Sequence, residues 1–347
     1  MSRTSAYRRG AVALSVIALT AAACGGADEP DAGAGTTGGD DGGNEETVTL
    51  SFAHSYATNH PHQVCGVEPI QEQVAAADVG LEIEIFPDSS LGGHAERFAS
   101  VVSGDIDIDI QGPSEISATY PAIGVLDAAY AIEGPDHLFT FFESPAGEQL
   151  REDMLAGTGV RTIEPWYFGM RHFTSNTPLE TPADFEGLRM RFPDTPQFLQ
   201  NAEALGASPT SVAFEEVYIS LQQGVVDGQE NPIPTIASLN LPEVQSHLNL
   251  TGHMTGIHMI VMNEDAWQSL SPEQQEVLET AIKDARDPNR DCIEAQENEY
   301  VEEWGGSGTM EIIEPDIDAF RDRAESFFLE ELDGDALELY TAVRETA

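Results

Sequence analysis

Two periods of hydrophobic residues alternate along the chain. Apolar residues at every second position predict strands, and apolar residues three to four positions apart predict helices. In the first third, strands are predicted at 48–52, 81–86 and 106–110, and helices at 61–77 and 95–102. Pro69 predicts an irregularity in the first helix, and Gly104 ends the second. Strands and helices that follow each other at short intervals indicate an α/β fold with a largely parallel sheet.

Strands and helices alternate in the same way again from Val160 onward. A strand at 188–192 carries apolar side chains on one face and Arg189 and Arg191 on the other. Arg191 is therefore expected at the carboxyl end of a buried strand. Further helices are predicted at 182–186, 196–205, 214–223 and 272–304. Because proline lacks a backbone N–H and clashes with the preceding turn, Pro288 is expected to interrupt the last of these helices.

The composition is strongly acidic. The 347 residues include 61 Asp and Glu against 15 Lys and Arg, which gives a formal net charge of −46. Nucleic acid is excluded as a partner, because phosphate binding needs a basic face. With 41% hydrophobic residues the chain is globular, and its length suggests roughly two domains. Such an acidic surface indicates that the protein works in a salt-rich medium or that its charge keeps it soluble.

The N-terminal region has the features of an export signal. Residues 1–23 combine three arginines with an uncharged apolar run, too short to span a bilayer stably. Cys24 follows a stretch that resembles a bacterial lipobox, which predicts a lipid anchor; cleavage after an Ala-x-Ala site is the alternative. Residues 24–46 are rich in Gly and acidic residues and predict a flexible tether. Either way, the protein is expected outside the cytoplasmic membrane, in the periplasm or on the outer face of that membrane.

Arginines on buried strands are the main candidates for chemistry. In open α/β sheets ligands bind beyond the carboxyl ends of strands, where Arg191 is expected. Arg171 lies 20 residues earlier, after another alternating stretch. A guanidinium group matches a carboxylate in a planar, bidentate way. The alternative is that both arginines form structural salt bridges with the surplus carboxylates.

Other kinds of site are not indicated. His54, His60 and His62 fit no metal-binding spacing, and surface or helix-start positions explain them as well. No phosphate-binding glycine loop and no paired acid and base are visible, so we expect no metal, no cofactor and no enzymatic activity.

Several stretches carry a family resemblance. The second half contains GMRHFTSN (169–176), TPADFEGLRMRFPD (181–194), EALGASPTSVAFEEVYISLQQGVVDGQENP (203–232) and EVQSHLNLTGH (243–253). The first half contains LSFAHSYATNHPH (50–62), SSLGGHAERFASVVSGDIDI (89–108) and LDAAYAIEGPDH (126–137). With these motifs in order, the chain closely resembles the solute-binding proteins of tripartite ATP-independent periplasmic (TRAP) transporters, of the dicarboxylate-binding (DctP) type.

The resemblance implies a periplasmic-binding-protein-like fold. Two α/β domains enclose a ligand cleft, and the chain crosses between them several times. By this analogy, domain I comprises 47–167 and 257–296, and domain II comprises 168–256 and 297–347.

The resemblance also implies a binding site. Arg191 would pair with the ligand carboxylate, and Arg171 would support binding or orient the site. Asn231 would hydrogen-bond the ligand, and Phe214 would form an aromatic wall.

Five further candidates are less specific. Trp166 and Tyr167 precede the GMR motif and belong either to the cleft or to the core. Glu96 in the HAER segment and His54 near the end of the first strand are further candidates. Asp194 occupies a cleft position where the family often has an amide, which leaves the ligand's identity open.

The remaining cysteines, Cys65 and Cys292, map to the first domain and lie outside the reducing cytoplasm. They form either a disulfide or two free buried thiols.

The function implied by the resemblance is capture of an organic acid. The protein, expected to be a monomer, would deliver it to the small and large integral membrane subunits of the transporter. A binding protein that feeds a membrane signalling receptor is the alternative, because its sequence would look alike.

Overall fold

The computed structural model describes residues 47–347. The predicted signal peptide, Cys24 and the tether lie outside the described residues. The strands are β1 (Val48–Ala53), β2 (Leu81–Phe86), β3 (Ile108–Gln111), β4 (Val160–Ser175), β5 (Arg189–Phe192), β6 (Ser208–Ser211), β7 (Gly228–Pro232), β8 (His247–Asn263) and β9 (Glu311–Ile313). The predicted strands in the first third are thus present, with small shifts at their ends.

Helices connect most of these strands. The α-helices are α1 (Glu68–Ala77), α2 (His94–Ser103), α3 (Pro113–Ile116), α4 (Pro135–Glu143), α5 (Pro145–Thr158), α6 (Pro196–Leu205), α7 (Val217–Gln222), α8 (Ile233–Ser238), α9 (Glu264–Ser269), α10 (Pro272–Ser307), α11 (Ile317–Glu331) and α12 (Gly334–Arg344). A π-helix, η1 (His62–Val67), precedes α1, and 3₁₀ turns are η2 (Pro121–Asp127), η3 (Pro182–Phe185), η4 (Phe214–Glu216) and η5 (Leu241–Glu243). Gly104 and Gly206 end α2 and α6 in the left-handed conformation, as glycine allows.

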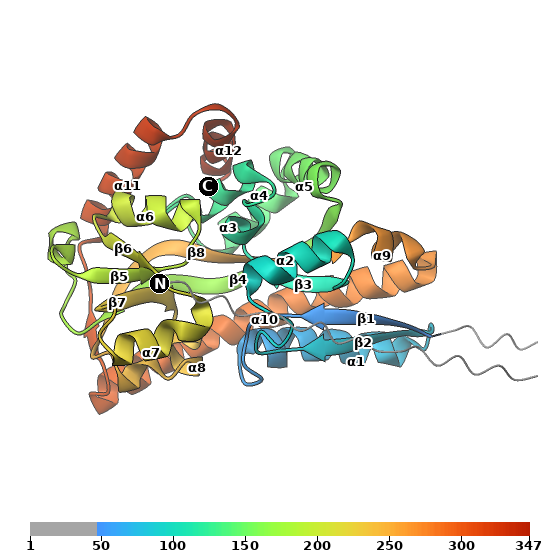
Figure 1. Ribbon diagram of the computed structural model, residues 1–347, viewed down its shortest axis with the longest axis horizontal. Helices are drawn as coiled ribbons and strands as arrows, with labels where there is room; N and C mark the ends of the chain where they lie inside the picture. Colours follow the sequence, from blue (N-terminus) through green and yellow to red (C-terminus); the bar gives the residue numbers. More distant parts are fainter. Residues whose placement is uncertain (1–46) are drawn as a thin grey trace, which may run out of the picture. The chain divides into compact units, whose positions relative to one another are not determined.

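All nine strands belong to one mixed sheet, with the order β2-β1-β3-β8-β4-β7-β5-β6 and β9 paired to β8 (Figure 1). The outer pairs are parallel, but β3 with β8, β8 with β4, and β4 with β7 are antiparallel. The prediction of a largely parallel sheet is therefore wrong for its centre. The reason is that β4 and β8, of 16 and 17 residues, run past each other in opposite directions.

These two long strands join two groups of short ones. One group, the first lobe, contains β1, β2 and β3; the other, the second lobe, contains β5, β6 and β7. Between the lobes the β4–β8 register shifts after Tyr167, and Gly169 then pairs with Gly256. Gly169 has φ +116°, and a Cβ on Gly256 would lie 2.7 Å from the Gly169 carbonyl oxygen. Only glycine fits both positions.

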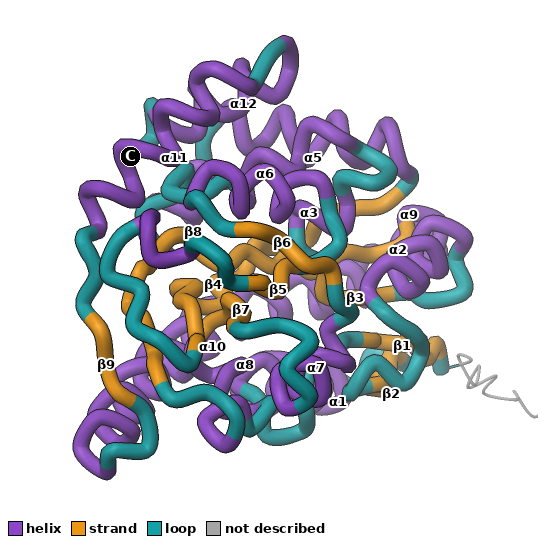
Figure 2. The backbone as a smooth tube through the Cα atoms, turned by 60° about the vertical axis from the view of Figure 1, so that its left-hand side comes forward, coloured by secondary structure: helices purple, strands orange, loops and turns teal. Residues whose placement is uncertain are grey.

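Helix α10 runs for 36 residues along the sheet and contacts η1 and α1 of the first lobe as well as α8 and β9 (Figures 1 and 2). The prediction that Pro288 interrupts this helix is wrong, because α10 continues through it. Neighbouring contacts hold the helix there: the buried Asn289 side chain bonds His62 and the Tyr167 carbonyl. A disulfide joins Cys292 of α10 to Cys65 of η1, whose Cα atoms lie 6.5 Å apart.

The two C-terminal helices contact both lobes. Helix α11 packs on α6 of the second lobe, whereas α12 packs on η2 and α5, which precede β4. Phe320, Phe328 and Tyr340 of these helices belong to the same buried hydrophobic cluster as Phe141 and Phe185. Within residues 47–347, no helix combines the length and the apolar character that crossing a bilayer requires.

Candidate ligand-binding site

A cavity of about 330 Å³ lies where the two lobes face each other. From the first lobe, the start of α2, the turn into α3 and the end of η2 line it. From the second lobe, the end of β5, the start of α6, the 212–215 segment and β7 line it. Strands β3 and β5 both end at this cavity, as expected for ligand sites in α/β sheets.

Arg191 brings a buried positive charge to this cavity. Arg191 is 2% exposed, and its Nε donates a hydrogen bond to the Val212 carbonyl oxygen at 2.9 Å. Within residues 47–347, no acidic side chain lies within 4.0 Å of its guanidinium group. Burial lowers the pKa of Arg191 to about 10, so that the group remains protonated at neutral pH. The cavity therefore contains a guanidinium without a carboxylate partner.

The strand explains why Arg191 differs from Arg189. Met190 and Phe192 of β5 are fully buried, which fixes the strand between β6 and β7. Arg189 at the exposed start of β5 forms an ion pair with Asp227, N to O 2.8 Å. Arg191 lies at the opposite end, where the strand meets the cavity.

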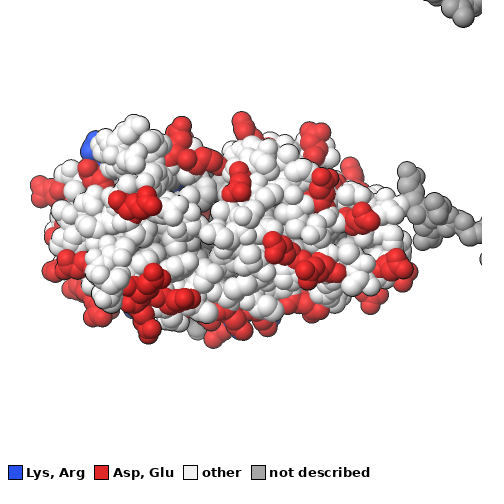
Figure 3. Space-filling model, turned by 90° about the horizontal axis from the view of Figure 1, so that it is seen from below, with Lys and Arg blue, Asp and Glu red and all other residues white. Residues whose placement is uncertain are grey.

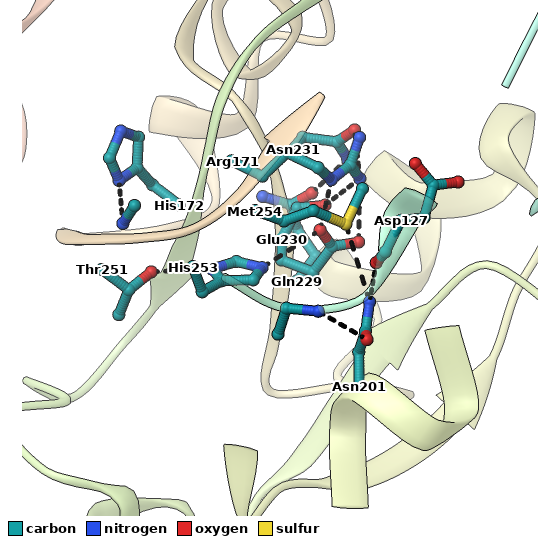
Figure 4. A network of polar contacts seen from close by, with 12 residues as sticks. Asp127, Arg171, His172, Asn201, Gln229, Glu230, Asn231, Thr251, His253 and Met254 are labelled. Atoms are coloured by element: carbon teal, nitrogen blue, oxygen red, sulfur yellow. Dashed lines mark hydrogen bonds and ion pairs between the residues drawn. The ribbon is translucent and has the colours of Figure 1, made fainter. Parts of the chain in front are cut away.

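Arg171 lines the same cavity but has a partner (Figure 4). Its Nη2 donates to Glu230 Oε1 at 2.8 Å and to Asn231 Oδ1 at 3.1 Å. His253 Nε2 lies 3.5 Å from Glu230 Oε2. Burial alone would raise the pKa of Glu230, but Arg171 and His253 outweigh that effect and hold it below its usual range. Arg171 is thus neutralised and held rigidly by Glu230.

Asn231 and Phe214 also line the cavity, together with the two arginines. The Asn231 amide accepts from Arg171 and donates to Gln229 Oε1 at 2.5 Å, so its orientation is fixed. The centroid of the Phe214 ring lies 6.0 Å from that of the His94 ring and 6.3 Å from that of the Tyr56 ring. The tertiary structure thus brings together at one cavity residues as distant in sequence as Tyr56 and Asn231.

Three other sequence candidates do not line the cavity. Trp166 is fully buried in the first-lobe core beside His62, at 5.5 Å between ring centroids. Tyr167 points toward α10, where its hydroxyl donates to Glu297 at 3.3 Å. His54 is buried and bonds Gln63 Oε1 at 2.7 Å. Alternation along β4 places Tyr167 on the opposite face from Phe168, which does line the cavity. Trp166 shares the face of Phe168 but lies two residues earlier, in the first-lobe core.

Glu96 and Asp194 line the cavity from its exposed rim. Glu96 also accepts from Gly93 N at 3.3 Å and so caps α2. Asp194 accepts from the Ser211 hydroxyl at 3.0 Å. Both carboxylates thus have structural roles as well as cavity positions.

Sequence reasoning missed several cavity residues, namely Tyr56, His94, Glu115, Asp127 and His258. Asp127 is 2% exposed; burial and the nearby Glu115 raise its pKa to about 7. Burial also raises the pKa of Glu115. Asp127 lies within the motif LDAAYAIEGPDH, so an acidic residue inside an apolar stretch was the available signal. Glu115 had none, because only the fold places the start of α3 beside Arg191.

The histidines form a buried chain, not a surface group. His62 Nε2 lies 2.7 Å from His258 Nδ1, and His258 Nε2 lies 2.8 Å from the Tyr56 hydroxyl. Burial lowers the pKa of His62 to about 3, so the ring is neutral. The surface interpretation is wrong, because His54, His60 and His62 are all buried. The helix-start interpretation is confirmed for His62, which begins η1. In the described part of the chain, no three His, Cys, Asp or Glu side chains are grouped so as to hold a metal ion.

Comparisons with known proteins agree with this architecture. The family model for bacterial extracellular solute-binding protein, family 7, matches residues 52–332. The sialic acid-binding periplasmic protein SiaP of Vibrio cholerae is 33% identical over 72% of this chain and 78% of its own length. The 2,3-diketo-L-gulonate-binding periplasmic protein YiaO of Escherichia coli is 30% identical over 70% of this chain and 74% of its own length.

Solved structures extend the similarity to the whole described fold. A TRAP periplasmic solute-binding protein of Roseobacter denitrificans with bound L-galactonate has a TM-score of 0.79 at 30% identity, over 86% of this chain and 99% of that one. A second protein of that organism, with bound 3-deoxy-D-manno-oct-2-ulosonic acid, has a TM-score of 0.81 at 27% identity, over 87% and 100%. The chain therefore belongs to bacterial extracellular solute-binding protein family 7, the family of TRAP transporter solute-binding proteins.

Proposed function

We propose that this chain captures an organic acid by pairing the ligand's carboxylate with Arg191, and delivers it to the small and large membrane subunits of a TRAP transporter. One observation carries the proposal: Arg191 is buried at the cavity and has no acidic partner within residues 47–347. A buried charge without a partner is costly. A ligand carboxylate supplies the missing partner.

The names of the relatives support this choice of ligand. Sialic acid, 2,3-diketo-L-gulonate, L-galactonate and 3-deoxy-D-manno-oct-2-ulosonic acid are all organic acids. In the proposed complex Arg171, held by Glu230, orients the site without supplying a net charge. Asn231 positions the carboxylate, and Phe214 packs against the body of the ligand.

Capture is proposed to end in closure of the two lobes about the Gly169–Gly256 crossing. Domain I (47–167 and 257–296) and domain II (168–256 and 297–347) would then enclose the ligand. Closure removes water from the ion pair, which strengthens it in a medium of lower dielectric constant. A contraction in solution scattering on ligand addition tests this step.

The proposal includes export and a lipid anchor at Cys24, which would keep a monomeric receptor near its membrane partners. Mass spectrometry of the mature N-terminal peptide tests the anchor. An unmodified N-terminus at a residue other than Cys24 would remove it from the proposal.

The decisive experiment is calorimetry with Arg191→Ala, using L-galactonate as the probe. Removing one member of a buried charge pair costs about 2–5 kcal/mol, so binding should weaken by at least about 30-fold. Arg321→Ala is the control, because Arg321 is an exposed arginine on α11. Unchanged affinity in Arg191→Ala for an acid that binds the wild type would overturn the assignment of the site.

A further inference from the structure

The cavity contains acidic side chains that an anion-binding site does not need. Besides the two arginines, its charged residues are Glu96, Glu115, Asp127, Asp194 and Glu215. Glu96, Asp194 and Glu215 are exposed, whereas Asp127 is buried and Glu115 is partly buried. Glu230 neutralises Arg171. Arg191 is therefore the one arginine of the cavity without an ion pair within residues 47–347, and it shares the inner cavity with the carboxyl groups of Glu115 and Asp127.

No contact that stabilises the fold explains why an acidic residue stands at position 115. It lies in the first turn of α3, and its side chain makes no hydrogen bond to another residue in the described range. Its carboxyl group lies over Gly112, where a Cβ would come within 2.5 Å of Glu115 Oε2. Gly112 has a φ of −83°, which any residue can adopt. Glycine is therefore needed here for the space it leaves to the Glu115 carboxyl group and not for its backbone conformation. The carboxyl group is thus accommodated beside the cavity, where its own backbone N–H is its one hydrogen-bond donor within the described range.

Asp127 adds a second free acceptor. Its Oδ2 accepts from Ser114 N at 2.9 Å, but its Oδ1 is buried and has no partner within residues 47–347. Two other buried atoms of cavity residues also have no partner within residues 47–347, namely His94 Nδ1 and Thr195 Oγ1. An unsatisfied buried polar group is destabilising, because it has lost its hydrogen bonds to water without replacement. Such a group at a cavity wall favours a ligand that satisfies it.

These groups set conditions on the ligand beyond its first carboxylate. A second carboxylate would lie near Glu115 and Asp127, without a second free guanidinium to neutralise it. Burial raises the pKa of both carboxyl groups, to about 7 for Asp127. In their ionised form, which predominates for Asp127 above pH 7, they repel a second carboxylate in this poorly solvated cavity. A hydroxyl or ammonium group at the same place would donate to these carboxyl groups.

Building on the proposed function, we propose that the cavity selects organic acids with a single carboxylate and hydrogen-bond donors along the rest of the molecule, and rejects dicarboxylates of the same length. Arg191 takes the carboxylate, and Glu115 and Asp127 accept from the donors. Two sources supply this chemistry, polyhydroxylated acids and acids that carry a distant ammonium group.

A panel matched in carbon number tests the selection. The four-carbon set is D-erythronate, with hydroxyl donors; 4-aminobutyrate, with an ammonium donor; succinate, with a second carboxylate; and butyrate, with neither. L-galactonate and adipate form the six-carbon pair. Calorimetry should give at least one donor-bearing acid a Kd about 10-fold or more below that of the dicarboxylate of equal length. The ratio between D-erythronate and 4-aminobutyrate identifies the source of the donors.

Variants link the selection to its residues. Glu115→Gln removes the charge but keeps the shape, so the preference for the donor-bearing acid over the dicarboxylate should shrink by about 5-fold or more. Glu216→Gln, the same change at an exposed residue outside the cavity, should leave the ratio unchanged. Asp127→Asn provides a second test if Glu115→Gln does not fold.

The outcomes separate this inference from the proposed function. If succinate or adipate binds as tightly as its donor-bearing counterpart while Arg191→Ala still weakens binding by the expected factor, the inference is wrong and the proposed function stands. An unchanged ratio in both acidic variants likewise overturns it. If none of the six acids binds the wild type, both fail together.

Discussion

At the scale of single residues, pairing decides what each charged group does. Arg171 and Arg191 are both buried at the cavity, yet the carboxylate of Glu230 neutralises only Arg171. The alternative of structural salt bridges therefore describes Arg171, and also Arg189 with Asp227, but not Arg191. A neutralised arginine holds its neighbours in place, whereas an unpaired one attracts an anion.

Asp127 provides a test of charge burial at this scale. Its pKa rises from 3.8 to about 7 on folding, mainly because burial disfavours the ionised form. For a raised carboxyl pKa, the stabilising contribution is complete below about pH 3.8 and is lost as the pH rises toward 7. Asp127→Asn cannot ionise, so its stability should rise relative to that of the wild type across this window, by roughly 4 kcal/mol in total once the pH is above 7.

Denaturant unfolding at a series of pH values measures this difference. Asp322→Asn, at an exposed position of α11, is the control and should show no such trend. A stability difference between Asp127→Asn and the wild type that stays constant from pH 4 to above pH 7 would contradict the prediction.

At the scale of elements, α10 and the two long strands hold the lobes together. Strands β4 and β8 pass through both lobes, and α10 packs along both. The disulfide and the Asn289 hydrogen bonds attach α10 to the first lobe near Pro288. These contacts offset the cost of about 3 kcal/mol that a proline imposes inside a helix.

The Cys65–Cys292 disulfide closes a long loop, because the two residues are 227 positions apart. In the chain-entropy model such a crosslink stabilises the folded state by up to about 5 kcal/mol, and measured values are often smaller. Reductant should therefore lower the urea midpoint of the wild type. The double variant with Cys65→Ser and Cys292→Ser should start at the lower midpoint and not respond to reductant.

Thiol labelling supplies the outcome that would contradict this disulfide. The mature protein is unfolded without reductant and then labelled. Two reactive cysteines at positions 65 and 292 would show that the residues are not bonded in solution.

At the scale of the whole molecule, the negative charge of the surface is opposite in sign to the one unpaired guanidinium group that the described residues bring to the cavity. The face in Figure 3 carries many Asp and Glu side chains and few Lys or Arg. The formal net charge is −46, whereas Arg191 gives the cavity a free positive group. An anionic ligand is thus repelled at long range and attracted at short range.

Salt should separate these two ranges. The Debye length falls to about 8 Å at physiological ionic strength, which screens the outer field but barely reaches a buried ion pair. The association rate of L-galactonate, followed by stopped-flow tryptophan fluorescence, should therefore rise with added salt. A neutral osmolyte at equal viscosity is the control. A rate that falls with salt would show that the cavity's own field dominates at long range.

The sequence by itself determined the family, the order of the elements and the importance of Arg191, because motifs and hydrophobic periods are local properties of the chain. It identified Arg171, Asn231 and Phe214 through the same motifs, and all three line the cavity.

Tertiary structure alone decided the rest. Phe168 lines the cavity, whereas Tyr167 lies on the other face of β4 and Trp166, on the same face, lies in the first-lobe core. The antiparallel pairing of β4 and β8 and the packing around Pro288 depend on contacts between distant segments. Glu115 and Asp127 acquired their place beside Arg191 only when the two lobes came together, since no local pattern encodes the proximity of residues so far apart.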